Sequence, residues 1–473
     1  MYGYAMNDPI SPEAEDENPR PASSTTSADK KRSTSDSSPE SDRKKMAARG
    51  LLLVTLLVVA AAVLAIPSVS ASSAIFPVFG DVYPLGVYYV AMNIGDPPKP
   101  YFLDVDTGSD LSWVQCDAPC IRCSKGPHPW YKPKRLLTDR DPLCVALHSG
   151  SAHDQEGDQC DYDIHYKDQG SSLGVLVADA FALRFANSNV FRHVLAFGCG
   201  YDQQFAIQNP QSVTDGVLGL GAGKVSILSQ LSDQGATKNV IGHCLSGKGG
   251  GFLFFGSDFI PSSGMTWMPM SRIASGYDAY IFWLELWILS ASKVLTCFFK
   301  RNYYSPGIAN LYWGTQSLGV NQMEVVLDAG STFSYFESQP YQAFLSAVKT
   351  DLSKKPLEEI NDPALPVCWK GPKPFKFLTD VKNYFKPLTL NFVSGNRTLF
   401  EIPPEKYLII TKDGHACLGV LNGSGVGLGN INVIGDISLQ EIMVVYDNEK
   451  QQIGWIRTAC ERKGQSKYGI SSP

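Results

Sequence analysis

Two aspartates in similar settings, Asp106 and Asp328, are the side chains best suited to chemistry. Each follows a mostly apolar run, Phe102–Val105 in the first case and Glu324–Leu327 in the second, and each begins a tetrapeptide of the form Asp-X-Gly-Ser. One Asp-X-Gly tripeptide marks an ordinary turn in many proteins. Two copies, one in each half of the chain, predict a duplicated lobe and a site where two carboxylates meet. Two close carboxylates cannot both ionise easily, so they share a proton and can act as a general acid and a general base.

The composition limits what kind of protein can carry such a site. The chain has 473 residues, 44% of them hydrophobic, with 42 glycines and a net charge of −5. This length suits two domains or one large bilobal unit, and the glycine content suits a turn-rich globular chain. The negative charge and the absence of a basic cluster from the body of the chain argue against a nucleic-acid partner.

Strands dominate the pattern that must position the two aspartates. Tyr88–Gly95 alternates as a strand does, and Tyr101–Val105 forms the next strand and delivers Asp106. Helical periodicity is rare, and Val225–Leu231 and Tyr341–Leu352 are its best examples. The sequence therefore predicts an all-β fold, mainly strands with a few short helices. Residues 82–260 are expected to form an N-terminal lobe that carries Asp106, and residues 265–473 a C-terminal lobe that carries Asp328.

The first 71 residues differ in composition from the rest of the chain. Residues 1–45 are polar and of low complexity and are predicted to be disordered. Residues 46–71 contain a short basic region, the apolar stretch 51–66 and a small-residue cleavage site, which is the pattern of a signal peptide. Because a signal peptide begins a protein, we hypothesise that translation starts at Met46 and that residues 1–45 are a gene-model extension. The alternative is a type II membrane anchor with a cytoplasmic tail.

Residues 277–301 interrupt the β-rich texture with a strongly apolar, aromatic segment. It approaches the roughly 20 apolar residues that a membrane span needs, but Glu285 and Lys293 lie inside it, and a span there would divide the second lobe. Three interpretations stay open: a translated intron, a packed or membrane-associated insert, and a full membrane span. Removing the segment joins Gly276 to Asn302 in a plausible turn and leaves ten cysteines, an even number.

Further motifs accompany the two aspartate turns. Gly216–Gly221 and Asn432–Asp436 each contain two apolar residues followed by glycine, and Tyr166–Gly174 has the sequence YKDQGSSLG. Together with DTGSDLSW and DAGST, these motifs resemble those of the pepsin-like aspartic proteases. In that family the two apolar-apolar-Gly elements close the active-site loops. The resemblance implies that Tyr166–Gly174 is a flap hairpin whose tyrosine, here Tyr166, is hydrogen-bonded by a tryptophan, here Trp113.

Motifs around the cysteines narrow the resemblance. The chain is similar to the nepenthesin-type branch found in plants and, within it, to the nucellin-like aspartic proteases of cereals. The segments that carry this resemblance are the cluster of Cys116, Cys120 and Cys123, and residues 197–200, 242–245, 365–370 and 416–419.

The resemblance implies a fold and a function. The fold is the bilobal pepsin-like acid protease fold, with the active site between two related lobes. The implied activity is that of a secreted, monomeric aspartic endopeptidase that cleaves peptide or protein substrates at acid pH without a metal or organic cofactor. Asp106 and Asp328 are then catalytic, and the supporting residues are Thr107, Gly108, Gly330, Ser331, Trp113 and the flap residue Tyr166. The extracellular space (apoplast) or the vacuole is the implied location, and no stable membrane partner is expected unless residues 51–66 are retained as an anchor. The alternative function is a protease-fold binding protein such as the xylanase inhibitors of cereals.

One departure from the family pattern concerns the second turn. Ala329 stands where the family carries Thr or Ser, a hydroxyl that normally hydrogen-bonds to the opposite turn. Thr107 retains the corresponding hydroxyl in the first turn. We therefore expect an active but weaker or less rigid enzyme.

The cysteines also depart from the family pattern. The cluster of three could form a zinc knuckle, but only His128 follows it, so disulfides are the better interpretation. Family pairing, transferred by motif, predicts Cys116–Cys120, Cys123–Cys199, Cys244–Cys460 and Cys368–Cys417. Cys144 and Cys160 lack their usual partners and are expected to pair with each other. Asn396 and Asn422 begin glycosylation sequons.

Overall fold

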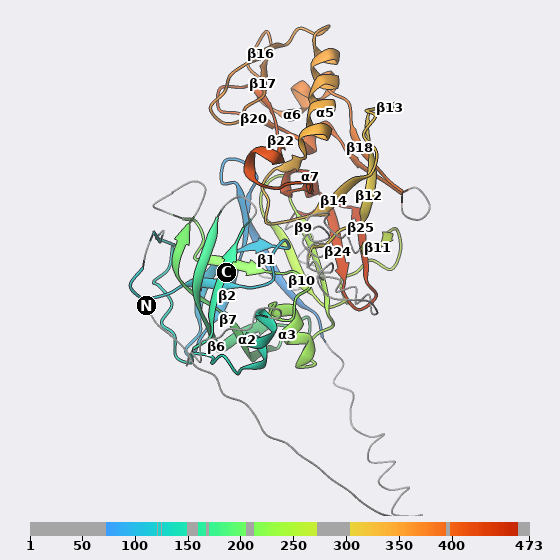
Figure 1. Ribbon diagram of the computed structural model, residues 1–473. Coiled ribbons are helices and arrows are strands. Elements are labelled where there is room, and N and C mark those ends of the chain that lie inside the picture. Colours follow the sequence, from blue (N-terminus) through green and yellow to red (C-terminus); the bar gives the residue numbers. More distant parts are fainter. Residues whose placement is uncertain are drawn as a thin grey trace, which may run out of the picture. The chain divides into compact units, whose positions relative to one another are not determined.

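The structure is a computed structural model. It describes residues 72–120, 122–123, 125–148, 159–166, 170–204, 212–271, 303–393 and 398–461 (Figure 1). The chain divides into two compact units, residues 1–68 and 69–473, and every described residue lies in the second. The predictions for residues 1–45, 46–71 and 277–301, and for Asn396, lie outside the described residues.

Strands make up most of the described chain. Those up to residue 269 are β1 (Ala74–Asp81), β2 (Val87–Ile94), β3 (Lys99–Asp106), β4 (Trp113–Gln115), β5 (Asp161–His165), β6 (Ser171–Arg184), β7 (Val190–Gln204), β8 (Gly216–Gly219), β9 (Val240–Leu245), β10 (Gly251–Phe255) and β11 (Thr266–Pro269). Those after residue 303 are β12 (Gly307–Trp313), β13 (Gln316–Ser317), β14 (Met323–Leu327), β15 (Ser334–Phe336), β16 (Glu358–Ile360), β17 (Cys368–Lys370), β18 (Leu388–Phe392), β19 (Thr398–Ile402), β20 (Leu408–Ile410), β21 (Ala416–Leu418), β22 (Val420–Asn422), β23 (Asn432–Ile434), β24 (Ile442–Asp447) and β25 (Gln452–Arg457).

The helices are short, with one exception. They are α2 (Pro142–Leu147), α3 (Ile227–Asp233), α5 (Ser338–Leu352), α6 (Leu378–Val381) and α7 (Asp436–Leu439), with 3-10 turns η1 (Lys382–Tyr384), η2 (Pro404–Lys406) and η3 (Gly423–Val426). The predicted helices are confirmed as α3 and α5. Helix α5 buries Tyr341, Phe344, Val348 and Leu352, which recur at the spacing of one helix face. Among the described residues, no helix is long and apolar enough to cross a membrane.

Three sheets organise these strands. A 13-stranded sheet has the order β11-β25-β24-β9-β10-β1-β2-β3-β8-β4-β7-β6-β5, an 8-stranded sheet contains β12, β14, β15 and β23, and a 4-stranded sheet has the order β16-β17-β21-β20. Strands β24 and β25, coloured red in Figure 1, pair with β9 and β11 from much earlier in the chain. The largest sheet is therefore shared by both halves of the sequence, and the prediction of a mainly β fold is confirmed.

The burial pattern distinguishes strands that are covered on both faces from strands that are covered on one face. Every residue of β9 and of β24 is buried, whereas β12 alternates strictly between buried and half-buried positions. A short apolar run that is buried throughout is typical of a strand covered on both faces, and alternation is typical of a strand covered on one. Two polar side chains, His243 on β9 and Tyr446 on β24, are fully buried in that central part of the sheet.

The described residues contain five disulfides. The pairings Cys144–Cys160, Cys244–Cys460 and Cys368–Cys417 confirm three predictions. The pairings predicted for the cysteine cluster are wrong, because the structure joins Cys116 to Cys199 and Cys120 to Cys123. These three cysteines of the cluster are thus held in disulfides and do not form the zinc knuckle that we considered.

Strand pairing explains the correction. Strand β4 runs parallel to β7, and the Cys116 amide donates to the Gly200 carbonyl over 2.8 Å. This register places Cys116 beside Cys199, with their Cα atoms 4.9 Å apart. Cys120 and Cys123 are left together on one loop, with Cα atoms 5.9 Å apart, a separation that a disulfide can span.

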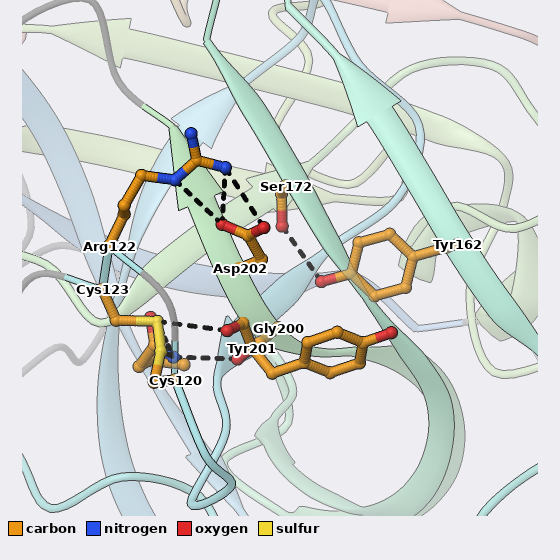
Figure 2. Close-up of a disulfide and its surroundings, with 9 residues drawn as sticks. Cys120, Arg122, Cys123, Tyr162, Ser172, Gly200, Tyr201 and Asp202 are labelled. Atoms are coloured by element: carbon orange, nitrogen blue, oxygen red, sulfur yellow. Dashed lines mark hydrogen bonds and ion pairs between the residues drawn. A yellow bond between two sulfur atoms is a disulfide. The ribbon is translucent and has the colours of Figure 1, made fainter.

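Figure 2 shows how this loop is attached to β7. Arg122, between the two cysteines, forms an ion pair with Asp202 at 3.0 Å. The side-chain amide of Gln115 donates to both sulfur atoms of the Cys120–Cys123 disulfide, at 3.1 and 2.9 Å. The loop is therefore attached to the sheet both at Arg122 and at the disulfide itself.

The two pairings differ in the loop they close, which predicts unequal stabilities. Cys116–Cys199 spans 83 residues and Cys120–Cys123 spans 3. On the chain-entropy estimate, replacing the first pair by serine should cost about 4.5 kcal/mol and replacing the second about 2 kcal/mol. Denaturant unfolding of the two double variants measures the difference. Under the family pairing, either double variant would break both bonds, so equal losses would contradict the pairing seen here.

Candidate active site

The two aspartates occupy equivalent places in the strand order. Asp106 ends β3, which runs parallel to β8, and its carbonyl accepts a hydrogen bond from the Leu220 amide at 2.7 Å. Asp328 directly follows β14, which runs parallel to β23, and its amide donates to the Ile434 carbonyl at 3.1 Å. In each half, therefore, an aspartate lies at the carboxyl end of a strand, beside the element with the apolar-apolar-Gly pattern.

The two turns lie directly against each other. A methyl group added to Gly108 would lie 2.8 Å from the Oδ1 atom of Asp328, and one added to Gly330 would collide with the Oδ1 atom of Asp106. Glycine is the residue that allows a backbone to approach another group this closely. The structure thus brings together Asp106, Asp328 and both glycines predicted to support them.

Each carboxylate is held by donors from its own turn. The Gly108 amide donates to Asp106 Oδ1 at 2.8 Å, and the Gly330 amide donates to Asp328 Oδ1 at 2.9 Å. The second oxygen of each accepts from a serine hydroxyl three residues on: Ser331 for Asp328, at 2.8 Å, and Ser109 for Asp106. Ser109 was missed by the sequence reasoning, although the repeated Asp-X-Gly-Ser pattern contained the signal.

Burial sets the protonation of the pair. Desolvation raises the pKa of Asp106, the charge of Asp328 raises it further, and the bonds from Ser109 and Gly108 oppose the rise. Desolvation also raises the pKa of Asp328, against the bonds from Gly330, Ser331 and the Gly108 amide. Since the two carboxylates are coupled and both prefer the neutral form, they hold a proton between them into weakly acid solution.

Two further carboxyl groups belong to this environment and were not among the predicted site residues. Asp436 begins α7, is 2% exposed, and has a pKa well above its usual range because of burial and the charges of Asp328, Asp104 and Asp106. Burial, and then the charge of Asp106, raise the pKa of Asp104 to about 8. Within the described part of the chain, the Oδ1 atom of neither Asp104 nor Asp436 has a hydrogen-bond partner.

The raised pKa of Asp104 makes stability depend on pH with a definite sign. A carboxyl that is easier to protonate in the folded state stabilises fully below its unfolded pKa, near 4, and this stabilisation is lost as pH rises toward about 8. Asp104→Asn should therefore reduce the fall in Tm between pH 4 and pH 8 by roughly 3–6 °C. Calorimetry across this range tests it, with exposed Asp413→Asn as the control. A fall as steep as in the unmodified chain would contradict the assignment.

Only one of the two turns supplies a side-chain hydroxyl to the hydrogen bonding between them, which we call the brace. The Ala329 amide donates to the Oγ1 atom of Thr107 over 2.9 Å, and both residues are buried. The alanine side chain has no hydroxyl to offer in return. The expectation that Thr107 keeps its half of the brace agrees with this geometry, and the opposite half is absent because of the residue type at position 329.

The structure also brings Trp113 and Tyr166 together. The indole Nε1 of Trp113 donates to the Tyr166 hydroxyl at 2.6 Å, and Trp113 is 3% exposed at the start of β4. Tyr166 follows β5, and its amide donates to the Gly170 carbonyl at 2.7 Å at the end of the β5–β6 hairpin. Residues 167–169 lie outside the described residues.

The side chain of Asn422, one of the two predicted glycosylation sites, takes part in a local cap. Its Oδ1 atom accepts from the Ser424 amide at 3.1 Å at the start of η3. Asn422 is half-buried. Its modification stays a prediction.

Comparison with known proteins identifies the family. Two family models match, one described as "Xylanase inhibitor N-terminal" over residues 88–257 and one as "Xylanase inhibitor C-terminal" over residues 314–456. An aspartic proteinase of Oryza sativa subsp. japonica is 43% identical over 417 residues, covering 85% of this chain and 95% of its own length. The aspartic proteinase nepenthesin-2 of Nepenthes gracilis is 26% identical, with 83% and 81% covered.

A solved structure agrees on the fold. Basic 7S globulin from soybean superposes with a TM-score of 0.59 at 16% sequence identity, covering 82% of this chain and 97% of that one. At this identity the likeness shows the pepsin-like fold alone. The near-complete coverage of the Oryza sativa proteinase at 43% identity shows more: the chain belongs to the pepsin-like aspartic proteases of plants.

Proposed function

We propose that the chain is an aspartic endopeptidase whose Asp106 and Asp328 activate a water molecule for peptide-bond hydrolysis at acid pH. The reciprocal packing of the two Asp-X-Gly turns carries this proposal, because it puts each carboxylate against the opposite turn, with Asp106 buried and Asp328 half-buried. The relatives named aspartic proteinases support a peptidase.

The chemistry follows from the shared proton and is the established one for aspartic proteases as a class. The protonated carboxyl donates to the oxygen of the scissile carbonyl, while the ionised one takes a proton from water, whose oxygen bonds to the carbonyl carbon. The tetrahedral intermediate breaks its C–N bond as the nitrogen receives a proton from the pair. The donors from Gly108, Ser109, Gly330 and Ser331 hold the carboxylates in place during these transfers.

Asp106→Asn tests the catalytic pair. The amide is nearly isosteric but neither carries the charge nor exchanges the proton, so kcat/KM on a peptide substrate at acid pH should fall by at least about a thousandfold. Asp413→Asn, the same change at an exposed position, is the matched control and should keep full activity. Proteolysis that survives Asp106→Asn would overturn the proposed mechanism.

A second candidate follows from the descriptions of the matched family models, which name xylanase inhibitors. On this alternative the chain binds a glycosidase instead of cleaving peptides. The polar donors retained around both carboxylates favour the enzyme, since a binding protein has no need of them. An absence of acid proteolysis together with tight binding to a xylanase would support the inhibitor.

We also propose a secretory route to the extracellular space or the vacuole, with a monomer as the working form. Five disulfides suit an oxidising compartment. Signal cleavage after Ala71 would leave Ser73, whose amide donates to Asp258 at 3.1 Å, near the new amino terminus. N-terminal sequencing of the protein from its native tissue should therefore begin at Ser72. A chain that retains residues 51–66 would favour the membrane-anchored alternative.

A further inference from the structure

The Cys120–Cys123 disulfide differs in exposure from the other four disulfides of the described residues. The eight cysteines of those four are buried, at most 3% exposed, whereas Cys120 and Cys123 are both half-buried. A thiolate must reach a sulfur atom in order to open a disulfide. This bond also joins residues only 3 positions apart, compared with 16 to 216 for the others, so it gains the least stabilisation from the chain it closes. Access and loop length therefore single out the same bond.

The two sulfur atoms lie beside a donor that can stabilise a departing thiolate. The side-chain amide of Gln115 is buried and donates to the Sγ atoms of Cys120 and Cys123 at 3.1 and 2.9 Å. Thiol–disulfide exchange releases one sulfur as a thiolate, so a donor within reach of both sulfurs favours the release of either. The guanidinium of Arg122 adds a positive charge to the same loop. These surroundings favour breaking of the S–S bond by an incoming thiolate.

The backbone of Arg122 is restrained by this disulfide. Its φ of 56° lies in the left-handed region, which is unfavourable for a residue that has a Cβ atom. Cys123 follows Arg122 directly and Cys120 precedes it by two positions, so the disulfide closes a ring that contains Arg122. An unfavourable conformation persists only where the surrounding structure imposes it. Opening the ring would therefore let Arg122 relax.

The side chain of Arg122 connects the ring to the end of β7. Its Nη2 atom donates to both carboxylate oxygens of Asp202, at 3.0 and 3.2 Å, a contact that Figure 2 shows. Its Nη1 atom donates to the Oε1 atom of Gln204 at 3.1 Å. Because the guanidinium is a planar fork, it holds two residues in a fixed geometry only while its own backbone stays in place. Asp202 and Gln204 would lose this shared anchor when the ring opens.

The end of β7 lies beside the base of the hairpin that carries Tyr166. Gln204 pairs with Ser171 at the start of β6, and Ser171 pairs with His165, the last residue of β5. Tyr166 follows directly, and its hydroxyl accepts the hydrogen bond from Trp113 at 2.6 Å. The disulfide ring is therefore connected to Tyr166 through two adjoining strand pairs.

We propose that Cys120–Cys123 is a thiol–disulfide exchange site and that its redox state sets how firmly the β5–β6 hairpin is held. The co-reactant is a dithiol. One of its thiolates bonds to one cysteine sulfur, the S–S bond breaks, and the other cysteine leaves as a thiolate that takes up a proton. The second thiolate of the dithiol then displaces the first cysteine from the mixed disulfide. The dithiol is oxidised to a disulfide, and its two electrons and two protons reduce both cysteines to thiols.

Limited reduction of the full chain tests the exchange site without an assay of activity. The oxidised protein is treated with dithiothreitol at pH 7, alkylated without denaturant and mapped by mass spectrometry. Cys120 and Cys123 should be labelled at least about tenfold faster than the eight cysteines of the other four disulfides, because a thiolate can reach only this bond readily. Labelling no faster than that of the buried pairs would overturn the exchange site.

The effect on the hairpin is measured as KM, and this part rests on the proposed protease function. In protein reduced and alkylated at Cys120 and Cys123, KM for a peptide substrate at acid pH should rise about three- to tenfold, with kcat changed less than about twofold. The reason is that a hairpin held less firmly contributes less to substrate binding. The double variant Cys120→Ser/Cys123→Ser should show the same KM and no response to dithiothreitol.

A substitution that keeps both cysteines tests the connection through Arg122. Arg122→Gln should raise KM to a similar extent, and reduction of this variant should raise KM less than about twofold further, because the contact that transmits the effect is already lost. Arg192→Gln is the matched control. Arg192 lies near the other end of β7, where it forms an ion pair with Asp96 at 2.8 Å, and its replacement should leave KM unchanged.

The outcomes separate the exchange site, its connection to the hairpin and the function. Selective labelling with an unchanged KM, or a rise in KM that Arg122→Gln does not reproduce, would overturn the connection while the protease stands. If the oxidised, unmodified chain cleaves no peptide at acid pH, the proposed function fails and the effect on KM fails with it. The labelling rates then still confirm or overturn the exchange site.

Discussion

The close approach of the two Asp-X-Gly turns is the contact on which the rest of the structure depends. It forces like charges together in a buried place, which is unfavourable unless a proton is shared and the remaining charge is hydrogen-bonded. The turn amides and the hydroxyls of Ser109 and Ser331 supply those bonds. The parallel pairs β3–β8 and β14–β23 in turn keep the two aspartates in equivalent positions. A side chain larger than glycine at position 108 or 330 would push the turns apart.

The two halves solve the same geometric problem with different residues. The first turn has a threonine whose hydroxyl reaches across, while the second has an alanine that offers only its amide. The two turns are thus alike in their backbone hydrogen bonds and differ in the side chain that follows each aspartate.

Raised carboxyl pKa values are not confined to the catalytic pair. Within the described ranges, Asp104 and Asp436 each have one carboxyl oxygen without a hydrogen-bond partner, and each is easier to protonate than an ordinary aspartate. A folded state that holds these protons is favoured in acid, which is also where a carboxylate pair with one shared proton works. Stability and the proposed activity would therefore share a pH range for the same electrostatic reason.

Local sequence determined a large part of this protein. Short-range patterns predicted several elements. The periodicity of apolar residues was enough to predict the strands before Asp106 and the helix α5, and the repeated tetrapeptide marked the two aspartate turns. Three of the five disulfides described were also predicted, two from family motifs and one from the cysteines left over.

What tertiary structure decided is what depends on register between distant strands. The parallel pairing of β4 with β7 selected Cys199 as the partner of Cys116, against the pairing inferred from family motifs. The pairing of β24 with β9 placed Tyr446 beside His243, two residues that are 203 positions apart and share no motif. Tertiary packing, which no single segment sets, buries Asp436 and the Oδ1 atom of Asp104 and raises the pKa of both carboxyl groups.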